Sequence, residues 1–291
     1  MNTVQPVTGA AVTLARWLSH LIFLVFAHIW PYRKKIIRKN LEACFPELSD
    51  GDIKSLSLRY YRHISDLIVE TLLLANLEND DLRKLVSYEN SSLIHQLINQ
   101  KKDIVLIASH YGNWEYLFQL PLVADCTVLA AYSPVSNGYI DKKLKSIRSR
   151  FGIKLVPKSE WYRTALNRRG DEPTIFITIA DQRPPKAAKQ AVNFFGRTTY
   201  IQQGAARIAV RRNCAVVYAD VEKDGRNKYK FTFRLITSNA VLSDENAIMK
   251  SYYEALETTI RRQPEWWLWS HNRWKFGYQP SCPVHKPENV V

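Results

Sequence analysis

The stretch I-V-L-I-A-S-H-Y-G-N-W-E-Y, residues 104–116, decides the fold. Its first five residues form an uninterrupted apolar run rich in β-branched side chains, with charged residues before it and Gly112-Asn113 after it. Such a run is typical of a strand that is buried on both faces. Apolar residues then return at helical spacing. The stretch therefore predicts a strand, a turn and a helix, with His110 and Glu115 on either side of the turn.

His110 and Glu115 form an H-x4-E motif. Five positions rotate a helical side chain by about 500°, so the two residues would not share one helix face. A loop containing Gly112 could fold His110 back toward a carboxylate at the helix start. A histidine oriented by a glutamate is a general base that takes a proton from a hydroxyl or an amine. Alone, such a motif is more often a structural histidine beside a first-turn glutamate.

Composition limits the possible partners. The 291 residues include 41 Lys+Arg and 27 Asp+Glu, giving a net charge of +14. This balance indicates an anionic partner: a phospholipid surface, a phosphorylated glycolipid, an acidic carrier protein or a nucleic acid. Nucleic acid is disfavoured because no RNP-like strand, zinc spacing or helix-turn-helix is present and most aromatic residues lie in apolar runs. G-x-S-x-G, G-x-G-x-x-G and Walker motifs are absent, so we expect neither a serine hydrolase nor a nucleotide cofactor.

The cysteines do not form a recognisable site. They are far apart and include no C-x-x-C pair; they are Cys44, Cys126, Cys214 and Cys282. This spacing argues against zinc and against a disulfide framework, and it fits a reducing cytoplasmic setting. We therefore expect no metal and no cofactor.

Residues 10–30 are the most apolar part of the chain, but Arg16, His20 and His28 interrupt them. The uninterrupted run 21–27 is too short to span a bilayer, which takes about 20 residues. Basic residues follow at 33–35, and Trp17 and Trp30 flank the run. These features are typical of an interfacial helix with its basic side toward the cytoplasm, although a buried N-terminal helix would fit as well.

The rest of the chain predicts an α/β fold, with a mixed central sheet flanked by helices and an N-terminal membrane-associated helix. We expect an anchoring segment over 1–32 and one domain over 33–291, whose first part, 33–100, is mostly helical. Strands are predicted at 104–109, 127–131, 153–156, 174–180, 215–221 and 229–236, the last antiparallel or at an edge. Helices are predicted at 114–124, 138–151, 160–168, 202–212 and 246–262.

Several polar residues are further site candidates. Asp181 and Gln182 follow a predicted buried strand, at the strand end where α/β proteins place their sites. Arg150 ends a basic helix that could dock an acidic carrier or a head-group phosphate. Arg197 follows two phenylalanines and a glycine. Each of these could equally be a turn, a solvated face or a core-entering segment.

Five blocks in this order resemble the bacterial late lipid A acyltransferase family, which is related to the lysophospholipid acyltransferases. The blocks are RKNL (38–41) with FP (45–46), SHYGNWE (109–115), ADQ (180–182), NFFG (193–196) with GAA (204–206), and PEWWLWSHNRWK (264–275). The resemblance implies a glycerolipid-acyltransferase-like fold, with His110 as general base and Glu115 as its orienting carboxylate. It adds Asn113, Arg273 and Lys275 to the candidate substrate-binding residues.

The expected activity is acyl transfer from a thioester to a hydroxyl, at the cytoplasmic face of the inner membrane. The resemblance implies acyl carrier protein as donor and a lipid A precursor as acceptor. Acyl-CoA remains possible as donor because relatives that use it carry the same H-x4-E block. The same chemistry on an aminolipid, another glycolipid or a lysophospholipid stays open, as does a non-catalytic membrane-binding module.

Overall fold

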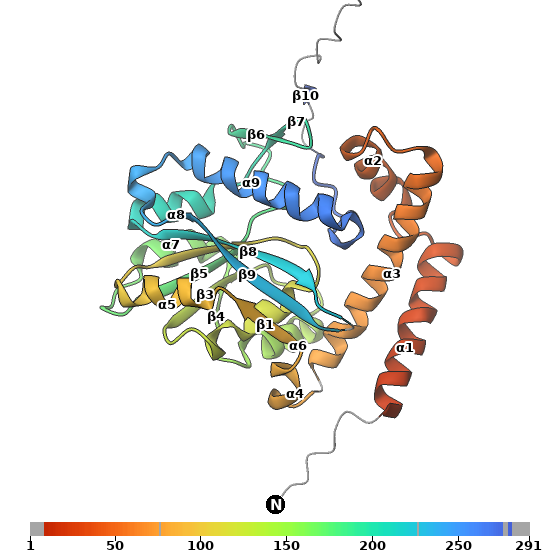
Figure 1. The fold of residues 1–291 in the computed structure, drawn as a ribbon, viewed down its shortest axis with the longest axis horizontal. Coiled ribbons are helices and arrows are strands. Elements are labelled where there is room, and N and C mark those ends of the chain that lie inside the picture. Colours follow the sequence, from red (N-terminus) through yellow and green to blue (C-terminus); the bar gives the residue numbers. More distant parts are fainter. Residues whose placement is uncertain (1–8, 76, 226, 276–278, 281–291) are drawn as a thin grey trace, which may run out of the picture.

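The computed structural model describes residues 9–75, 77–225, 227–275 and 279–280, and Figure 1 shows its arrangement. The helices are α1 (Gly9–Leu24), the π-helical η1 (Val25–Ile29), α2 (Lys34–Cys44), α3 (Asp50–Leu74), α4 (Asn79–Arg83), α5 (Ser91–Asn99), the 3-10 helix η2 (Trp114–Leu122), α6 (Gly138–Ser149), α7 (Lys158–Asn167), α8 (Gly204–Arg212), the 3-10 helix η3 (Ala240–Leu242), α9 (Glu245–Arg262) and the 3-10 helix η4 (Pro264–Trp266). The strands are β1 (Val86–Glu89), β2 (Ile104–Ala108), β3 (Thr127–Tyr132), β4 (Lys154–Pro157), β5 (Thr174–Ile179), β6 (Ala191–Phe194), β7 (Arg197–Tyr200), β8 (Ala215–Lys223), β9 (Tyr229–Thr237) and β10 (Gln279–Pro280).

A seven-stranded mixed sheet has the order β1-β9-β8-β2-β5-β3-β4. β2 lies between β8 and β5, parallel to both, and all five of its residues are buried. Its continuous apolar sequence therefore follows from having helices over both faces. α8 and α9 cover one face, and α5 and α6 lie on the other (Figure 1). The predicted α/β sheet flanked by helices is confirmed.

The antiparallel pairing predicted for residues 229–236 is confirmed, because β9 runs antiparallel to β8. β9 is not the edge, however, since β1 pairs with its other side. The sequence prediction missed β1 because its four residues lie in a segment that otherwise reads as helical. A second, three-stranded sheet, β10-β7-β6, was also not predicted.

The helix predicted over 114–124 is a 3-10 helix, η2, rather than an α-helix. Pro121 lies inside it and has no N–H to donate to an α-helical hydrogen bond. The side chain of Asn113 accepts a hydrogen bond from the backbone N–H of Glu115 and so caps the first turn.

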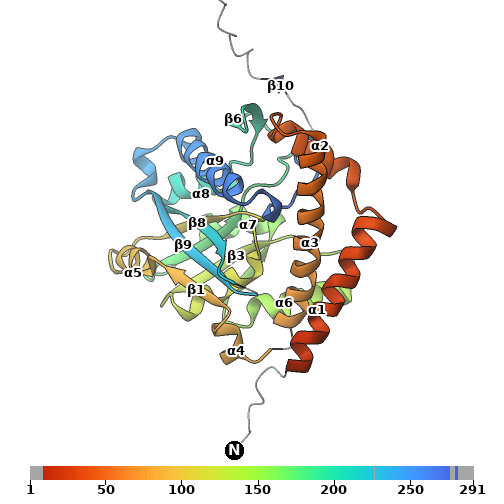
Figure 2. The same cartoon turned by 45° about the vertical axis from the view of Figure 1, so that its right-hand side comes forward.

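The long helix α3 packs beside α1 along one side of the molecule (Figure 2). α3 begins at a capping box, in which the Ser49 hydroxyl and the Asp52 carboxylate satisfy each other's backbone N–H groups. Buried residues of α2 and α3 belong to the same hydrophobic core as the sheet.

α1 exposes an apolar stripe on the side away from α3. Its members recur every three or four residues and are Leu14, Trp17, Leu18 and Leu21, which are 70%, 68%, 39% and 58% exposed. In the described part of the chain, no single helix is long and apolar enough to cross a bilayer. The bent pair Thr13–Ile29 and Lys34–Cys44, at 86°, would reach that length and composition together. Residues 1–8 of the predicted anchoring segment lie outside the described residues.

Candidate active site

Two neighbouring parallel strands bring His110 and Asp181 together. β2 ends at Ala108 and β5 at Ile179, and the backbone N–H of Ala180 donates to the Ala108 carbonyl at 3.2 Å, which continues their pairing. His110 and Asp181 follow directly at the carboxyl edge of the sheet, where open α/β sheets place their ligands.

The Asp181 carboxylate accepts three N–H groups. Its Oδ1 lies 2.7 Å from His110 Nδ1, and its Oδ2 accepts from the His110 backbone N–H at 2.9 Å and from Trp267 Nε1 at 2.8 Å. The side chain is 2% exposed. Burial alone would raise the pKa of Asp181, but the electrostatic interaction with His110 and these hydrogen bonds outweigh it and lower the pKa below its ordinary value. Asp181 is therefore a carboxylate.

The ionised Asp181 fixes the role of each nitrogen of His110. A carboxylate can only accept hydrogen bonds, so Nδ1 carries a proton, and in the neutral imidazole Nε2 then has the free lone pair. The Gln182 side-chain amide donates to Nε2 at 3.0 Å. Trp114 packs edge-on against the imidazole, with ring centroids 4.8 Å apart. His110 thus presents a basic nitrogen, in a fixed orientation, beside Gln182.

The turn after His110 requires its glycine. Gly112 has φ +59°, and a Cβ there would lie 3.2 Å from the Tyr229 ring. The Gly112 N–H donates to the Trp266 carbonyl at 3.0 Å, and the Leu268 N–H donates to the His110 carbonyl at 3.0 Å. Residues 266–268, which belong to the block at 264–275, therefore run alongside the turn and hold it in place.

Two tyrosines of α9 fasten the strand ends that carry the site. The Tyr252 hydroxyl donates to the Ala108 carbonyl at 2.9 Å, and the Tyr253 hydroxyl donates to the Ala180 carbonyl at 3.1 Å. Arg273, which is 2% exposed, donates in turn to the Tyr253 hydroxyl at 3.0 Å and to the Tyr200 carbonyl at 2.7 Å. Arg273 therefore supports the strand end that leads into Asp181.

Glu115 contacts an arginine rather than His110. Arg148 of α6 donates to Glu115 Oε2 from Nε at 2.8 Å and to Oε1 from Nη2 at 2.6 Å. The sequence predicted Glu115 as the orienting carboxylate of His110. Among the described residues, the carboxylate against His110 is that of Asp181. The sequence placed Asp181 at the correct strand end but could not show that the two strands are neighbours.

His110 opens into a cavity of about 390 Å³. Much of its wall is apolar or aromatic, as in pockets that bury the chain of a ligand. Its polar lining consists of His110, Ser133, Arg148, Lys158, Thr178, Gln182 and Gln202. The apolar and aromatic part is formed by Trp114, Phe118, Ala131, Tyr132, Trp161, Tyr162, Ile179, Ala180 and Ala205. A chain lying there would have one end beside the basic nitrogen of His110.

The other predicted site residues lie outside this wall. Asn113 is fully buried and donates to Glu70 Oε2 at 3.0 Å, so its visible role is structural. Arg150 donates to the Leu74 carbonyl at 3.3 Å. Arg197 stacks over the Trp274 ring, 5.5 Å from its centroid, and Lys275 is exposed.

Sequence reasoning did not select Arg148 or Trp267 as site residues. Arg148 was visible only as part of a basic helix, in which charge gives no sign of which side chain turns inward. Trp267 was visible only as one tryptophan of an aromatic block. Within the described residues, no cluster of three His, Cys, Asp or Glu side chains could hold a metal ion.

Comparison with known proteins identifies the family of the chain. Residues 12–276 match the family model of the bacterial lipid A biosynthesis acyltransferases. The chain belongs to that family. It is therefore an acyltransferase.

Individual lipid A biosynthesis acyltransferases are distant in sequence. The lauroyltransferase of Escherichia coli (strain K12) is 22% identical over 262 residues, covering 84% of this chain and 79% of that protein. The acyltransferase of Haemophilus influenzae is 21% identical over 266 residues, covering 90% of this chain and 84% of that protein. The palmitoleoyltransferase of Escherichia coli (strain K12) is 21% identical over 245 residues, covering 84% of this chain and 79% of that protein.

Proposed function

We propose that this protein transfers a fatty acyl chain from an acyl thioester to a hydroxyl of a lipid A precursor. Acyl carrier protein is the favoured donor, and acyl-CoA the alternative. The observation that carries the proposal is the orientation of His110, with Nδ1 held by the buried Asp181 and the ring beside a cavity whose wall is partly apolar and aromatic. Membership of the lipid A biosynthesis acyltransferases supports the acceptor.

In this proposal His110 is the general base and Asp181, rather than Glu115, orients it. The acceptor hydroxyl takes the place of the Gln182 amide at Nε2 and gives its proton to that nitrogen. Its oxygen then attacks the thioester carbonyl. When the tetrahedral intermediate collapses, the carbon–sulfur bond breaks and the thiolate takes the proton from His110. Asp181 stabilises the imidazolium between these two steps.

Arg148 is the proposed partner of the developing oxyanion. The Gly112 N–H, which lies on the turn beside His110, already donates to Trp266. Arg148 lines the same cavity as His110, and its Nη1 is not engaged by Glu115. A cation fixed in place before the reaction stabilises new negative charge without reorganising. Glu115 would then act by holding Arg148 in position.

We further propose that α1 lies in the membrane interface, at the cytoplasmic face of the inner membrane. The support is its stripe of exposed apolar side chains, which includes Trp17. The basic residues that follow at 33–35 would face anionic head groups. On α6, Lys142 and Lys143 are exposed and belong to the same helix as Arg148, which suits docking of an acidic carrier protein.

A labelled acyl-transfer assay on the purified protein tests the function. Acyl carrier protein and CoA thioesters are each offered with a lipid A precursor, a lysophospholipid and an aminolipid. We expect transfer to the lipid A precursor and a loss of at least about 10²-fold in His110→Ala. Transfer to a different acceptor would keep the mechanism and overturn the acceptor. Wild type and His110→Ala equally inactive with every pair, while still binding vesicles, would favour a binding module.

A further inference from the structure

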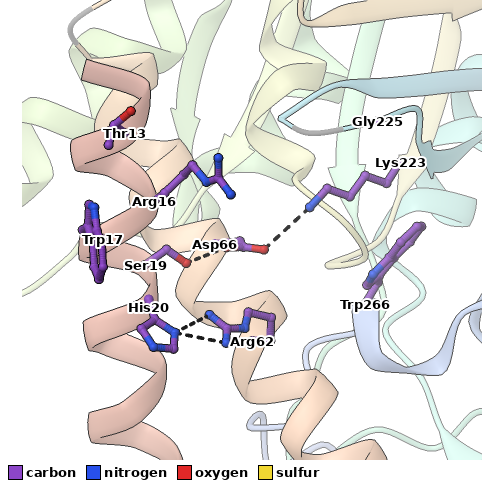
Figure 3. Close-up of a pocket in the computed structure, with 10 residues that line it drawn as sticks. All are labelled: Thr13, Arg16, Trp17, Ser19, His20, Arg62, Asp66, Lys223, Gly225 and Trp266. Carbon is purple, nitrogen blue, oxygen red and sulfur yellow. Dashed lines mark hydrogen bonds and ion pairs between the residues drawn. The ribbon is translucent and has the colours of Figure 1, made fainter. Parts of the chain in front are cut away.

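A second cavity, of about 970 Å³, lies between α1, α3 and the hairpin that joins β8 to β9. Figure 3 shows its lining residues, with Arg16 of α1 and Lys223 of β8 directed toward one another across the space. Trp266 forms part of the wall, and Trp17 lies on the outer side of α1 at the rim. Among the described residues, this groove shares no lining residue with the His110 cavity.

The groove is positively charged. Three permanent cations line it, namely Arg16, Arg62 and Lys223, against the single carboxylate of Asp66 among its described lining residues. Asp66 accepts from Ser19 at 2.5 Å and lies 3.8 Å from Lys223, whose ammonium is also 3.7 Å from the buried Glu70. The groove cations that pair with no carboxylate among the described residues are therefore Arg16 and Arg62. Arg62 is held in place by His20 Nδ1, at 3.2 Å from both Nη atoms, and by the Phe23 ring. Cations prepositioned around one hollow fit an oxyanion such as a phosphate.

The apolar surface beside the groove indicates what carries that phosphate. Trp17 belongs both to the groove rim and to the exposed stripe of α1. An amphiphile could therefore place its charged group among the arginines and its chains along the stripe. A free phosphate would use the cations alone and would leave Trp17, Leu14 and Leu21 in water.

We propose that this groove binds the phosphate head group of an anionic membrane lipid whose acyl chains lie along α1. The site is separate from the acyl-transfer chemistry, and it assigns α1 a lipid-specific role in addition to burial in the interface. One wall of the groove leads directly to the active site, because Trp266 accepts from Gly112 and the next residue, Trp267, donates to Asp181. A lipid bound there holds the His110 cavity at a fixed height relative to the head groups.

Vesicle flotation of the full chain tests this site without any turnover. The vesicles are phosphatidylglycerol-containing or pure phosphatidylcholine, at constant ionic strength. The variant Arg16→Gln/Arg62→Gln removes two groove cations that do not pair with a carboxylate among the described residues. Since each cation near an anionic surface is worth about fivefold in binding, we expect at least a tenfold loss on anionic vesicles and no change on neutral ones.

Matched variants separate a site from general electrostatics. Lys101→Gln/Arg169→Gln removes two exposed cations from the loops that precede β2 and β5, at the opposite edge of the sheet, and should stay within twofold of wild type. Arg16→Lys/Arg62→Lys should retain most of the binding. If the double Gln variant fails to fold, Arg16→Gln alone, at an exposed helix position, should still lose about fivefold.

Three results would overturn the proposal. The groove and control variants could lose anionic binding equally, which would indicate charge without a site. The groove variants could bind as wild type does. Inorganic phosphate at low millimolar concentration could abolish the groove-dependent binding, which would identify a free-anion site instead of a lipid site.

Discussion

Arg148 and Glu115 form a bidentate ion pair at the wall of the His110 cavity, with N–O distances of 2.8 and 2.6 Å. Glu115 is 5% exposed and Arg148 18%. The glutamate of the H-x4-E motif thus fixes a cation, while the histidine of the same motif takes its carboxylate from another strand. The two halves of the motif have separate structural tasks, and their variants should fail in different ways.

Asp181→Asn and Glu115→Gln distinguish the two carboxylates. A neutral amide in place of the Asp181 carboxylate could not stabilise an imidazolium. For Asp181→Asn we therefore expect kcat to fall on the order of 10²–10⁴-fold with little change in KM. We also expect the dependence of kcat on pH to change, because the catalytic imidazole has lost its carboxylate partner. Glu115→Gln leaves His110 and Asp181 paired and loosens Arg148, so we expect a smaller loss of kcat with an unchanged pH profile. Steady-state kinetics across pH measure both, and identical profiles would contradict the separation.

The ion pair itself predicts strong coupling between its partners. Removing either charge leaves the other buried and unpaired, whereas removing both does not. We therefore expect Glu115→Leu/Arg148→Leu to lose about 1–3 kcal/mol less unfolding free energy than the sum of the two single variants. Urea unfolding of the four proteins measures this coupling. Additive losses would show that the pair is not formed in solution.

Gly204 offers a way to narrow the cavity. It begins α8 and lines the His110 cavity, and a Cβ built there meets no atom within 4 Å. In Gly204→Leu we expect kcat/KM for the longest accepted acyl donor to fall roughly tenfold relative to shorter donors. Gly138→Leu is the matched control, because Gly138 also begins a helix and has open space but does not line this cavity. If both variants showed the same preference for acyl donor length, the acyl chain would not lie beside Gly204.

His63 predicts a dependence of stability on pH. It is 5% exposed, and burial, with the nearby Lys223, lowers its pKa from 6.5 to about 3. Between these two values the unfolded chain binds a proton that the folded chain does not. The unfolding free energy must therefore decrease as pH falls from about 6.5 toward 3, by up to about 1.4 kcal/mol per pH unit.

His271 adds a second contribution of the same sign, since burial lowers its pKa to about 4. In His63→Gln, the slope of the unfolding free energy against pH should decrease between about pH 6 and pH 4.5 by the equivalent of about one proton. The contribution of His271 to that slope should remain. Urea unfolding at three pH values in this range measures the slope for wild type and variant. Parallel curves would show that His63 is not buried and neutral.

The apolar stripe on α1 predicts membrane binding that does not depend on lipid charge. Leu14→Gln/Leu21→Gln removes two side chains that are 70% and 58% exposed. Because their burial in the interface would drive binding, we expect at least about a tenfold loss on both neutral and anionic vesicles. The thermal midpoint should hardly change. Flotation with both vesicle types measures this, and unaltered binding to neutral vesicles would exclude α1 as the interfacial helix.

Local pattern was sufficient to predict the central fold. The run 104–108 predicted a strand covered on both faces, and it is β2. The alternation of strands and helices after it gave the α/β sheet. β1 was not predicted because four residues are too few to show a clear strand pattern. Its stability comes from pairing with β9, which lies far along the chain.

The sequence placed the residues of the candidate site at strand ends but did not predict their contacts. His110 and Asp181 were each recognisable at a strand end. That they meet follows from β2 and β5 being neighbours, although β3 and β4 lie between them in sequence. Spacing along the chain instead favoured Glu115, the nearer carboxylate in sequence. Likewise Arg148 and Arg150 are only two residues apart in the sequence. The way α6 packs against η2 brings Arg148 to Glu115 at the cavity wall, whereas Arg150 contacts the Leu74 carbonyl.

The fastening of the strand ends by α9 and the C-terminal block has a consequence for synthesis of the chain. His110, Asp181 and Arg148 leave the ribosome before Tyr252, Tyr253 and Trp267, on which the positions of the first two depend. A nascent chain carries its complete H-x4-E motif while the carbonyls of Ala108 and Ala180 still lack their tyrosine donors. Under the proposed mechanism, His110 is therefore held in its working orientation only after most of the chain has been synthesised, and we expect the shorter nascent chain to be inactive.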